Sequence, residues 1–211
     1  MIIARIQAHP SRNGLHDRLK RLLSPLPTEL FVHQSDPPDP WSGYKRCLTD
    51  IPSEVRHLLV VQDDAIPVAG FAAAVGRIAE RHPNDPVCLF MGALPASTAT
   101  LVRRAKPDVR YVPLMPAAFM PLICVLWPAD VARSFLTWTE TARGMSRGDD
   151  NNAGRWYRSC SRRQQVWVTV PSLVRHDDGQ PSVKGGRAHT PWAESWRQAL
   201  FLAANGDDYE W

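Results

Sequence analysis

The chain has 211 residues, of which 44% are hydrophobic and 22% are charged, with a net charge of +4. This length favours one α/β domain over residues 1–211 with a full hydrophobic core. No apolar run approaches the roughly 20 residues of a membrane-spanning helix, and the N-terminus has no signal-peptide pattern. We therefore expect a cytoplasmic protein without a membrane partner. The four cysteines form no CxxC pair, which is typical of reduced core residues and argues against zinc.

In chain order, the apolar patterns predict strands and helices that alternate nearly throughout. The predicted elements are a strand at 2–7, a helix at 15–23, a strand at 30–32, a helix at 41–48, a strand at 58–61, a helix at 69–82, a strand at 87–91, a helix at 98–106, strands at 109–112 and 123–127, helices at 128–138 and from 149 or 150 to about 160, a strand at 165–170 and a helix at 192–202. The proline-rich stretches 35–40 and 113–121 are predicted to be irregular, and the second could form a lid. This alternation predicts a three-layer α/β/α architecture with a mostly parallel central sheet.

The run Leu58–Val61 is the clearest strand signal, and it leads into two adjacent carboxylates, Asp63 and Asp64. Four consecutive apolar residues are typical of a strand that is buried on both faces of a parallel sheet. The acidic pair then lies at the carboxyl edge of the sheet, where open α/β folds bind ligands. Because isolated buried carboxylates are costly, we expect this pair to meet water, a cation or a basic partner.

Two further polar clusters could complete a site with this pair. Mg²⁺ or Mn²⁺ takes one or two carboxylates and completes its shell with water and phosphate oxygens. His176 could add a nitrogen ligand, or it could be a loop histidine bonded to the backbone. Asp149 and Asp150 lie at the start of a predicted helix, where either could be a general base toward an acceptor hydroxyl or a plain N-cap.

Basic residues early in the chain are candidates for binding a phosphorylated donor. Arg12 lies in the turn after the first strand, a usual place for a nucleotide, although no glycine-rich fingerprint is present. It could contact a donor phosphate or be an exposed turn residue. Lys45 and Arg46, in the helix predicted at 41–48, are assigned with Arg12 and Asp63 to the donor-binding set.

Positive charge is concentrated between residues 143 and 175, where seven arginines accompany two aspartates and give a local net charge of +5. This segment is either a solvated helix face or a phosphate-facing surface, since arginine offers a bidentate fork to phosphate. The candidates for nucleic-acid contact are Arg147, Arg155, Arg158, Arg162 and Arg163. A nucleobase in the site would also need stacking partners, for which Trp156, Tyr157 and Trp167 are candidates or, alternatively, core residues.

Five segments resemble the compact nucleotide-sugar glycosyltransferases of the GT-A fold, particularly the small enzymes encoded by bacteriophages. In order, these segments are Trp41–Leu48, Leu59–Ala65, Gly148–Trp156, Val170–His176 and Arg197–Phe201. Their order and spacing cover residues 1 to 203. The strand that ends in two aspartates, combined with the Pro-Ser-Leu-Val-x-His element at 171–176, is the most specific part of the resemblance.

The resemblance implies a GT-A-like α/β fold and a metal-dependent transfer of a sugar, such as glucose, from a nucleotide donor. It implies that Asp64, with Asp63, holds Mn²⁺ or Mg²⁺ at the diphosphate of a UDP-linked donor, and that His176 approaches the same metal. It also implies that Asp150 or Asp149 is the acceptor-side base if the enzyme inverts the sugar carbon. The adjacent carboxylates depart from the Asp-x-Asp spacing of many family members, so the one that contacts the metal directly is left open.

The acceptor is less defined than the donor. Some phage enzymes of this type glucosylate 5-hydroxymethylpyrimidines in DNA, and the arginine-rich segment favours such a polyanion. The expected acceptor is therefore 5-hydroxymethylcytosine in DNA, and the expected place of action is the host cytoplasm. The alternatives are a protein or saccharide acceptor, a non-catalytic DNA-binding domain and a metal-dependent nuclease. No sequence pattern predicts the oligomeric state.

Overall fold

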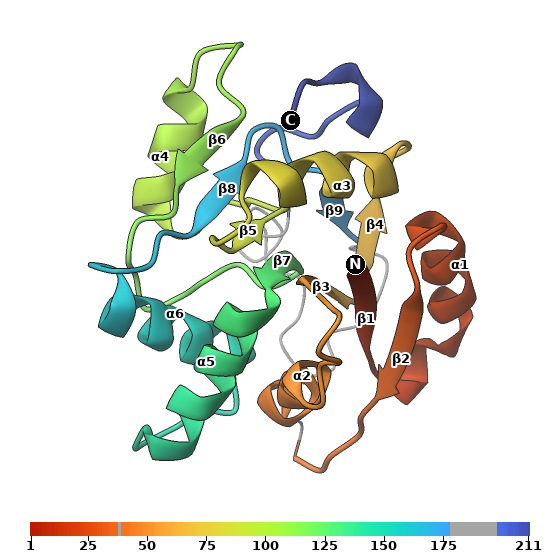
Figure 1. Cartoon of the computed structure of the whole chain (residues 1–211), viewed down its shortest axis with the longest axis vertical. Helices are drawn as coiled ribbons and strands as arrows, with labels where there is room; N and C mark the ends of the chain where they lie inside the picture. The colour runs from red at the N-terminus through yellow and green to blue at the C-terminus, as the bar shows by residue number, and fades with distance from the viewer. Residues whose placement is uncertain (38, 178–197) are drawn as a thin grey trace.

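The computed structural model describes residues 1–37, 39–177 and 198–211, which form an α/β structure around a central sheet (Figure 1). Its strands are β1 (Ile2–Ala8), β2 (Thr28–Val32), β3 (His57–Gln62), β4 (Ala65–Pro67), β5 (Val87–Cys88), β6 (Tyr111–Pro113), β7 (Cys124–Pro128), β8 (Trp167–Thr169) and β9 (Val174–His176). Its helices are α1 (Asn13–Leu23), α2 (Pro40–Leu48), α3 (Phe71–Arg81), α4 (Ala96–Arg104), α5 (Ala129–Thr141) and α6 (Asp149–Cys160), with short 3-10 turns η1 (Pro10–Arg12) and η2 (Gly206–Asp208). None of these described helices is long and apolar enough to cross a bilayer.

The central sheet contains seven of the described strands in the order β2-β1-β3-β7-β5-β8-β6. The strands β2, β1, β3, β5 and β8 point in one direction, whereas β7 and β6 run antiparallel to their neighbours. The predicted α/β/α layering around a mostly parallel central sheet is therefore confirmed. The apolar run of β7 carries no information about strand direction, so its antiparallel place between β3 and β5 emerges only from the structure.

Alternate residues of the central strands contribute to two hydrophobic cores on opposite faces of the sheet. In β3, Leu58 and Val60 belong to one core, and Leu59 and Val61 belong to the other. Helices α2, α5 and α6 cover the first face, and α1 and α3 cover the second (Figure 1). Because helices cover both faces, every position of the strand interior favours an apolar residue, which explains the continuous run in the sequence.

The strand predicted at 87–91 is shorter than expected. Its ladder ends at Cys88. One more backbone bond reaches β7, from Leu89 N–H to Cys124 O at 2.9 Å, and Met91 N–H then donates to Ser172 Oγ at 3.0 Å and not to a strand carbonyl. The apolar character of Phe90 and Met91 reflects burial and not strand pairing.

The helix predicted at 192–202 is wrong over residues 198–202, which contain no helix. Leu200 N–H donates to Met91 O at 2.9 Å, so its backbone donor is paired with a residue distant in the sequence and not with a carbonyl of the preceding helical turn. Residues 192–197 lie outside the described part of the chain.

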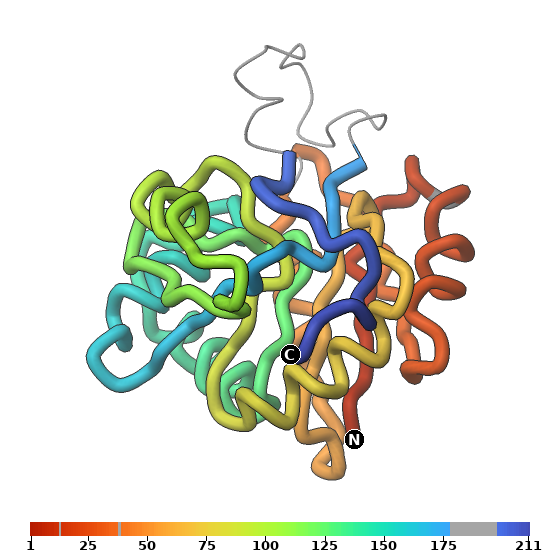
Figure 2. The backbone as a smooth tube through the Cα atoms, turned by 90° about the horizontal axis from the view of Figure 1, so that it is seen from above, coloured from red at the N-terminus to blue at the C-terminus, as the bar shows by residue number. Residues whose placement is uncertain are grey.

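A separate two-stranded sheet, β4 paired antiparallel with β9, has no counterpart among the predicted elements. Its register places Ala65 opposite His176. The C-terminal segment then runs over α3, where Arg77 Nη2 donates to Gly206 O at 3.0 Å (Figure 2). The small sheet matters for the site because it brings the end of β9 to the residues that follow β3.

Candidate functional site

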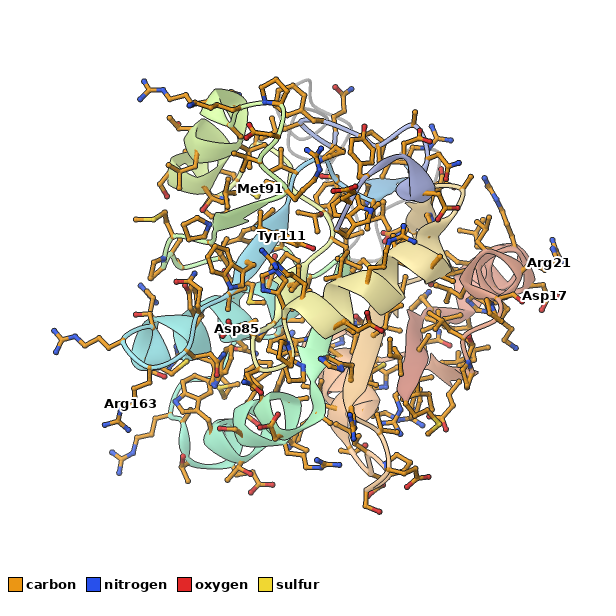
Figure 3. All side chains as sticks on the ribbon, turned by 45° about the horizontal axis from the view of Figure 1, so that its top comes forward. Asp17, Arg21, Asp85, Met91, Tyr111 and Arg163 are labelled. Carbon is orange, nitrogen blue, oxygen red and sulfur yellow. The ribbon has the colours of Figure 1, made fainter. Side chains whose placement is uncertain are left out.

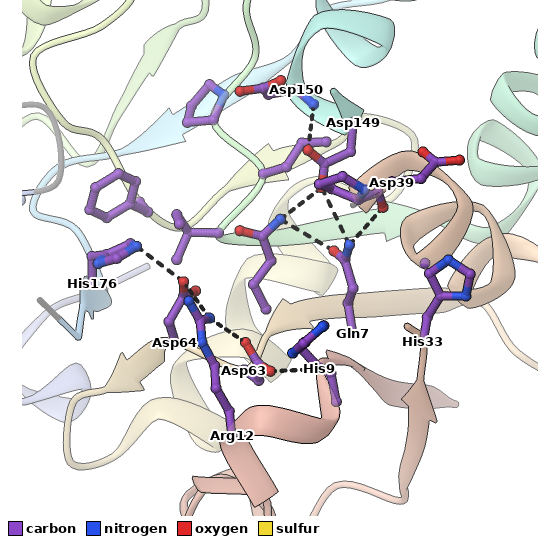
Figure 4. Close-up of a pocket in the computed structure, with 18 of the residues that line it drawn as sticks. Gln7, His9, Arg12, His33, Asp39, Asp63, Asp64, Asp149, Asp150 and His176 are labelled. Atoms are coloured by element: carbon purple, nitrogen blue, oxygen red, sulfur yellow. Dashed lines mark hydrogen bonds and ion pairs between the residues drawn. The ribbon is translucent and has the colours of Figure 1, made fainter. Parts of the chain in front are cut away.

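A cavity of about 300 Å³ lies at the carboxyl ends of β1, β2 and β3. The first turns of α2 and α6 and the segment 119–123 form its other walls. This volume is at the lower end of the range of roughly 300–1,000 Å³ that is typical of ligand pockets. Six residues predicted for the site line it together: Arg12, Asp63, Asp64, Asp149, Asp150 and His176 (Figure 4).

The first acidic pair shares one cation, the guanidinium of Arg12. Arg12 Nη1 is 2.6 Å from Asp63 Oδ1 and 2.8 Å from Asp64 Oδ2. Arg12 ends η1 directly after β1 and is buried, so it is not an exposed turn residue. Asp63 Oδ2 accepts the backbone N–H of His9 at 2.7 Å. Both oxygens of Asp63 are therefore occupied by protein donors.

The pairing of β4 with β9 places His176 beside Asp64. Because β4 begins directly after Asp64, the pairing of Ala65 with His176 places the imidazole beside that carboxylate. His176 Nε2 is 3.2 Å from Asp64 Oδ2, and Asp177 N–H donates to the carbonyl of Asp64 at 2.7 Å. The other carboxylate oxygen, Asp64 Oδ1, is buried and has no hydrogen-bond partner among the described residues.

The two carboxylates of this pair have opposite pKa shifts. Burial raises the pKa of Asp63 above its ordinary value, although the His9 N–H and Arg12 act against it. Burial also acts to raise the pKa of Asp64, but the hydrogen bond and charge of His176, together with Arg12, outweigh it and hold that pKa at about 2. Asp64 therefore remains anionic at neutral pH, which suits a group that binds a cation.

The donor set at this end of the cavity can be tested for its fit to a divalent metal ion. No group of three or more His, Cys, Asp or Glu side chains in the described ranges is placed to hold a metal on its own. However, the unpaired Asp64 Oδ1 offers an oxygen donor, and the imidazole of His176, in its neutral form, would offer the nitrogen donor that Mg²⁺ or Mn²⁺ accepts. These residues fit a cation whose remaining ligands come from phosphate oxygens and water, and not a closed metal centre.

At the other end of the cavity, amide side chains from two adjacent strands hold Asp149. Gln62 Nε2 donates to Asp149 Oδ2 at 2.8 Å, and Gln7 Nε2 reaches the same oxygen at 3.5 Å. Gln7 and Gln62 face each other in the β1–β3 register. Asp149 Oδ1 accepts the N–H of Asp150 at 2.9 Å. Asp149 is thus a buried, oriented carboxylate in the first turn of α6.

Asp150 is the carboxylate of this second pair that is more open to the cavity. It is half-buried, Oδ1 accepts the N–H of Asn151 at 2.7 Å, and its carbonyl accepts the N–H of Met120 at 3.1 Å. The N-cap of α6 is Gly148, so the plain N-cap role considered for Asp149 and Asp150 is wrong. Both acids lie in the first helical turn, where the helix dipole favours negative charge.

The structure does not bring Lys45 and Arg46 to the cavity. Helix α2 turns Tyr44 and Cys47 into the core, and Arg46 is exposed and donates to Val32 O at 3.1 Å. Neither Lys45 nor Arg46 lines the cavity, so the donor contact predicted for them is not supported by the geometry.

The arginines predicted to contact nucleic acid also lie outside the cavity. Arg158, Arg162 and Arg163 are exposed at or beyond the last turn of α6, whose 12 residues span about 18 Å (Figure 3 labels Arg163 at the periphery). Arg155 is used structurally, since it donates to the carbonyls of Arg143 and Gly144 in the loop after α5.

Arg147 is the member of that set closest to the site in the chain. It is exposed two residues before Asp149, and its carbonyl accepts the N–H of Trp41 at 3.1 Å at the start of α2. Sequence proximity thus indicates one arginine near the second acidic pair, whereas Arg158, Arg162 and Arg163 lie at the far end of α6.

The aromatic residues considered for base stacking do not line the cavity. Trp156 packs against Trp127 in the core, and Tyr157 is buried with its hydroxyl donating to Leu114 O at 2.8 Å. Trp167 Nε1 donates to Asp85 Oδ2 at 3.2 Å in another part of the molecule. The core alternative is therefore correct for Trp156 and Tyr157.

Several cavity residues are not singled out by the sequence. Gln7 and Gln62 hold Asp149, while His9 and His33 follow β1 and β2 on the cavity wall. Burial lowers the pKa of His9, with Arg12 adding to the effect and Asp63 opposing it. The sequence does contain a signal for the two glutamines as site residues. Gln7 and Gln62 are the polar residues that end two apolar runs, and the ends of parallel strands meet at one edge of the sheet.

Comparison with known proteins identifies a similar fold. No protein-family model matches the chain, and no curated protein matches it significantly. The crystal structure of A197 from STIV superposes with a TM-score of 0.50 at 12% identity, covering 90% of this chain and 98% of that chain. A 4-diphosphocytidyl-2C-methyl-D-erythritol synthase from Anaerococcus prevotii DSM 20548 gives a TM-score of 0.44 at 11% identity, covering 80% and 87%. At these identities the first likeness concerns the fold alone, and the second adds nothing to it.

Proposed function

We propose that this protein is a metal-assisted glycosyltransferase that moves a sugar from a nucleoside diphosphate donor to a hydroxyl acceptor. The observation that carries the proposal is a single cavity with two different acidic ends. One end offers Asp64 and His176 as donors to a cation, and the other offers Asp150 in the first turn of a helix. A diphosphate at the first end and an acceptor hydroxyl at the second would place the sugar between them.

At the donor end, Asp64 and His176 would hold the cation, and Arg12 and Asp63 would support them. Asp64 has the unpaired oxygen, whereas both oxygens of Asp63 are taken by Arg12 and His9. This supports Asp64 as the direct ligand and Asp63 as the residue that fixes Arg12. When bound, Mg²⁺ or Mn²⁺ supplies charge neutralisation to the leaving diphosphate.

At the acceptor end, Asp150 accepts the proton of the attacking hydroxyl. The acceptor oxygen then forms a bond to the anomeric carbon of the sugar. The bond from that carbon to the β-phosphate oxygen breaks, and the nucleoside diphosphate leaves with the electron pair. This single displacement inverts the anomeric carbon. Asp149 orients the first turn of α6 from behind, through Gln62 and Gln7.

For the acceptor, we keep 5-hydroxymethylcytosine in DNA as the first candidate and a protein or saccharide hydroxyl as the second. Exposed Arg147 near the second acidic pair favours a polyanion. The remote position of Arg158, Arg162 and Arg163 argues that a DNA acceptor would have to extend along α6 to meet them.

The test is a transfer assay with purified protein, Mn²⁺ or Mg²⁺, and UDP-, GDP-, CDP- and dTDP-linked sugars. The acceptors are DNA containing 5-hydroxymethylcytosine, a protein mixture and simple glycosides, each analysed by mass spectrometry. The expected result is a mass gain of one hexose on one acceptor class, with release of a nucleoside diphosphate. Cleavage of DNA without any sugar donor would instead identify a nuclease, and salt-sensitive DNA binding without turnover would identify a binding domain.

Asp150→Asn tests the assignment of the base. Loss of a general base lowers kcat by roughly 10²–10⁴-fold, while binding of the nucleoside diphosphate, measured by calorimetry, should be unchanged. Asp17→Asn is the matched control, because Asp17 is exposed on α1 away from the cavity (Figure 3). An Asp150→Asn enzyme with wild-type kcat would remove Asp150 from the mechanism.

A further inference from the structure

One wall of the cavity is apolar and continuous along the chain. Phe119, Pro121, Leu122 and Ile123 line the cavity, and the buried Met120 lies between them. At one end of this segment, Met120 N–H donates to Asp150 O at 3.1 Å. At the other end, Gln62 N–H donates to Ile123 O at 2.9 Å, next to the first acidic pair. The wall therefore spans the cavity from one acidic end to the other and is bonded at both.

Phe119 is the aromatic member of this wall at the Asp150 end. Its side chain is half-buried and belongs to neither of the two hydrophobic cores of the described residues. By contrast, Phe90 also lines the cavity but is buried within the second core. The ring of Phe119 thus contributes apolar surface to the cavity without completing the core.

The position of Phe119 is fixed by its contact with α6. A Cβ atom added to Gly154 would lie 2.6 Å from both Ala118 C and Phe119 N, so the backbone of this segment packs directly on the helix. Together with the Met120–Asp150 hydrogen bond, this contact holds the segment against α6 as a wall of the cavity, and not as the lid that its prolines suggest. Phe119 and Asp150 are consequently attached to backbone segments that pack directly on each other.

We propose that Phe119 forms a stacking subsite for the acceptor, and that the acceptor carries its hydroxyl on a methylene group attached to a flat aromatic ring. This inference rests on the proposed function, which places the acceptor at the Asp150 end. Aromatic rings stack favourably on one another in offset geometry. A saccharide would bring several hydroxyl groups that need partners, and this wall offers none, since Phe119, Pro121 and Leu122 have no polar side-chain atoms; the polar lining residues lie on the other walls.

The test measures binding separately from turnover. Benzyl alcohol and 5-hydroxymethylcytidine are the aromatic probes, and methyl glucoside and propanediol are the comparison probes. Each is titrated by ligand-observed NMR against the full chain in the presence of UDP and Mg²⁺. We expect both aromatic probes to bind more tightly than the comparison probes. We expect Phe119→Ala to raise their Kd by about 5- to 150-fold and Phe119→Tyr to restore it.

Two variants serve as controls. Phe201→Ala removes an exposed phenylalanine outside the cavity and should leave the Kd unchanged. Gly154→Ala should displace the wall and weaken the aromatic probes, while the Kd for UDP stays at the wild-type value. UDP binding and transfer report on the proposed function itself. Aromatic binding that depends on Phe119 without any transfer would retain the subsite and reject the transferase. Equal binding to wild type and Phe119→Ala, or tighter binding of methyl glucoside, would overturn the subsite.

Discussion

Two pairs of adjacent aspartates line the same cavity, and the structure gives them different partners. Asp63 and Asp64 are both buried, and a full positive charge on Arg12 lies between them. Asp149 is buried against the neutral amides of two glutamines, and Asp150 is half-open to the cavity. The same dipeptide thus forms a charge cluster after a strand and an oriented acid at the start of a helix.

The residues that contact each pair, and not the Asp-Asp dipeptide itself, therefore set its chemistry. At the first pair, two buried carboxylates share one guanidinium, and Asp64 Oδ1 has no hydrogen-bond partner among the described residues, so a further cation can bind this oxygen. At the helix, the amide donors and the N-terminal dipole stabilise a carboxylate without a cation. The first pair is therefore suited to hold a metal with a diphosphate, and the second is suited to accept a proton.

The largest expected effect tests the metal role of the first pair. Asp64→Asn keeps the shape of the side chain but removes the charge beside His176. Because charge neutralisation of a leaving group contributes several kcal/mol, transfer should fall at least about 10³-fold. Steady-state assays over a range of Mn²⁺ concentrations measure this loss, with Asp17→Asn as the control. Retained transfer would show that the two pairs do not divide the chemistry in this way.

The next two predictions compare the stability that a charged partner gives the first pair with the stability that a neutral partner gives Asp149. Arg12→Met leaves two buried carboxylates without their cation, which should lower the free energy of unfolding by about 3–5 kcal/mol. Urea titration followed by tryptophan fluorescence measures this change. A loss below about 1 kcal/mol would mean that the pair does not depend on Arg12 for its charge balance.

Removing the neutral partner of Asp149, Gln62, should lower the free energy of unfolding by less than removing Arg12 does. Gln62→Leu removes the 2.8 Å hydrogen bond to Asp149 while Gln7 remains near the same oxygen. The expected loss is about 1–2 kcal/mol by the same urea titration, since one hydrogen bond to a charged group is removed. If Gln62→Leu proved as damaging as Arg12→Met, the contrast between the two pairs would fail.

Most of the fold could be predicted because the burial of each element is visible in its own sequence. The run Leu58–Val61 identifies a doubly covered strand, and the two aspartates after it mark the ligand edge. Direction and register cannot be predicted in this way, because they depend on pairing between distant segments. The β4–β9 register that places His176 beside Asp64 is an example.

The partners of the site residues also depend on contacts between distant segments, so the sequence does not predict them. The arginines after Asp150 are close to it in the chain, but α6 carries Arg163 away from the cavity. The helix predicted at 192–202 follows an apolar pattern, yet at Leu200 the backbone bonds to Met91 instead. Local pattern therefore located the acidic pairs, and only tertiary structure supplied their partners.

The smallest expected effect concerns the pH dependence of the first pair. The pKa of Asp64 is about 2 in the folded protein, against an ordinary value of 3.8. Because the folded value is the lower one, the stability contributed by ionised Asp64 is present above pH 4 and is lost as the pH falls toward 2. Wild type should therefore lose about 1 kcal/mol more than Asp64→Asn between pH 5 and pH 3. Asp63, whose raised pKa acts with the opposite sign, is present in both proteins and largely cancels in the difference. Urea titrations of the two proteins at pH 5, 4 and 3 measure this difference in the free energy of unfolding. A difference that does not change with pH would show that His176 and Arg12 do not stabilise the Asp64 carboxylate.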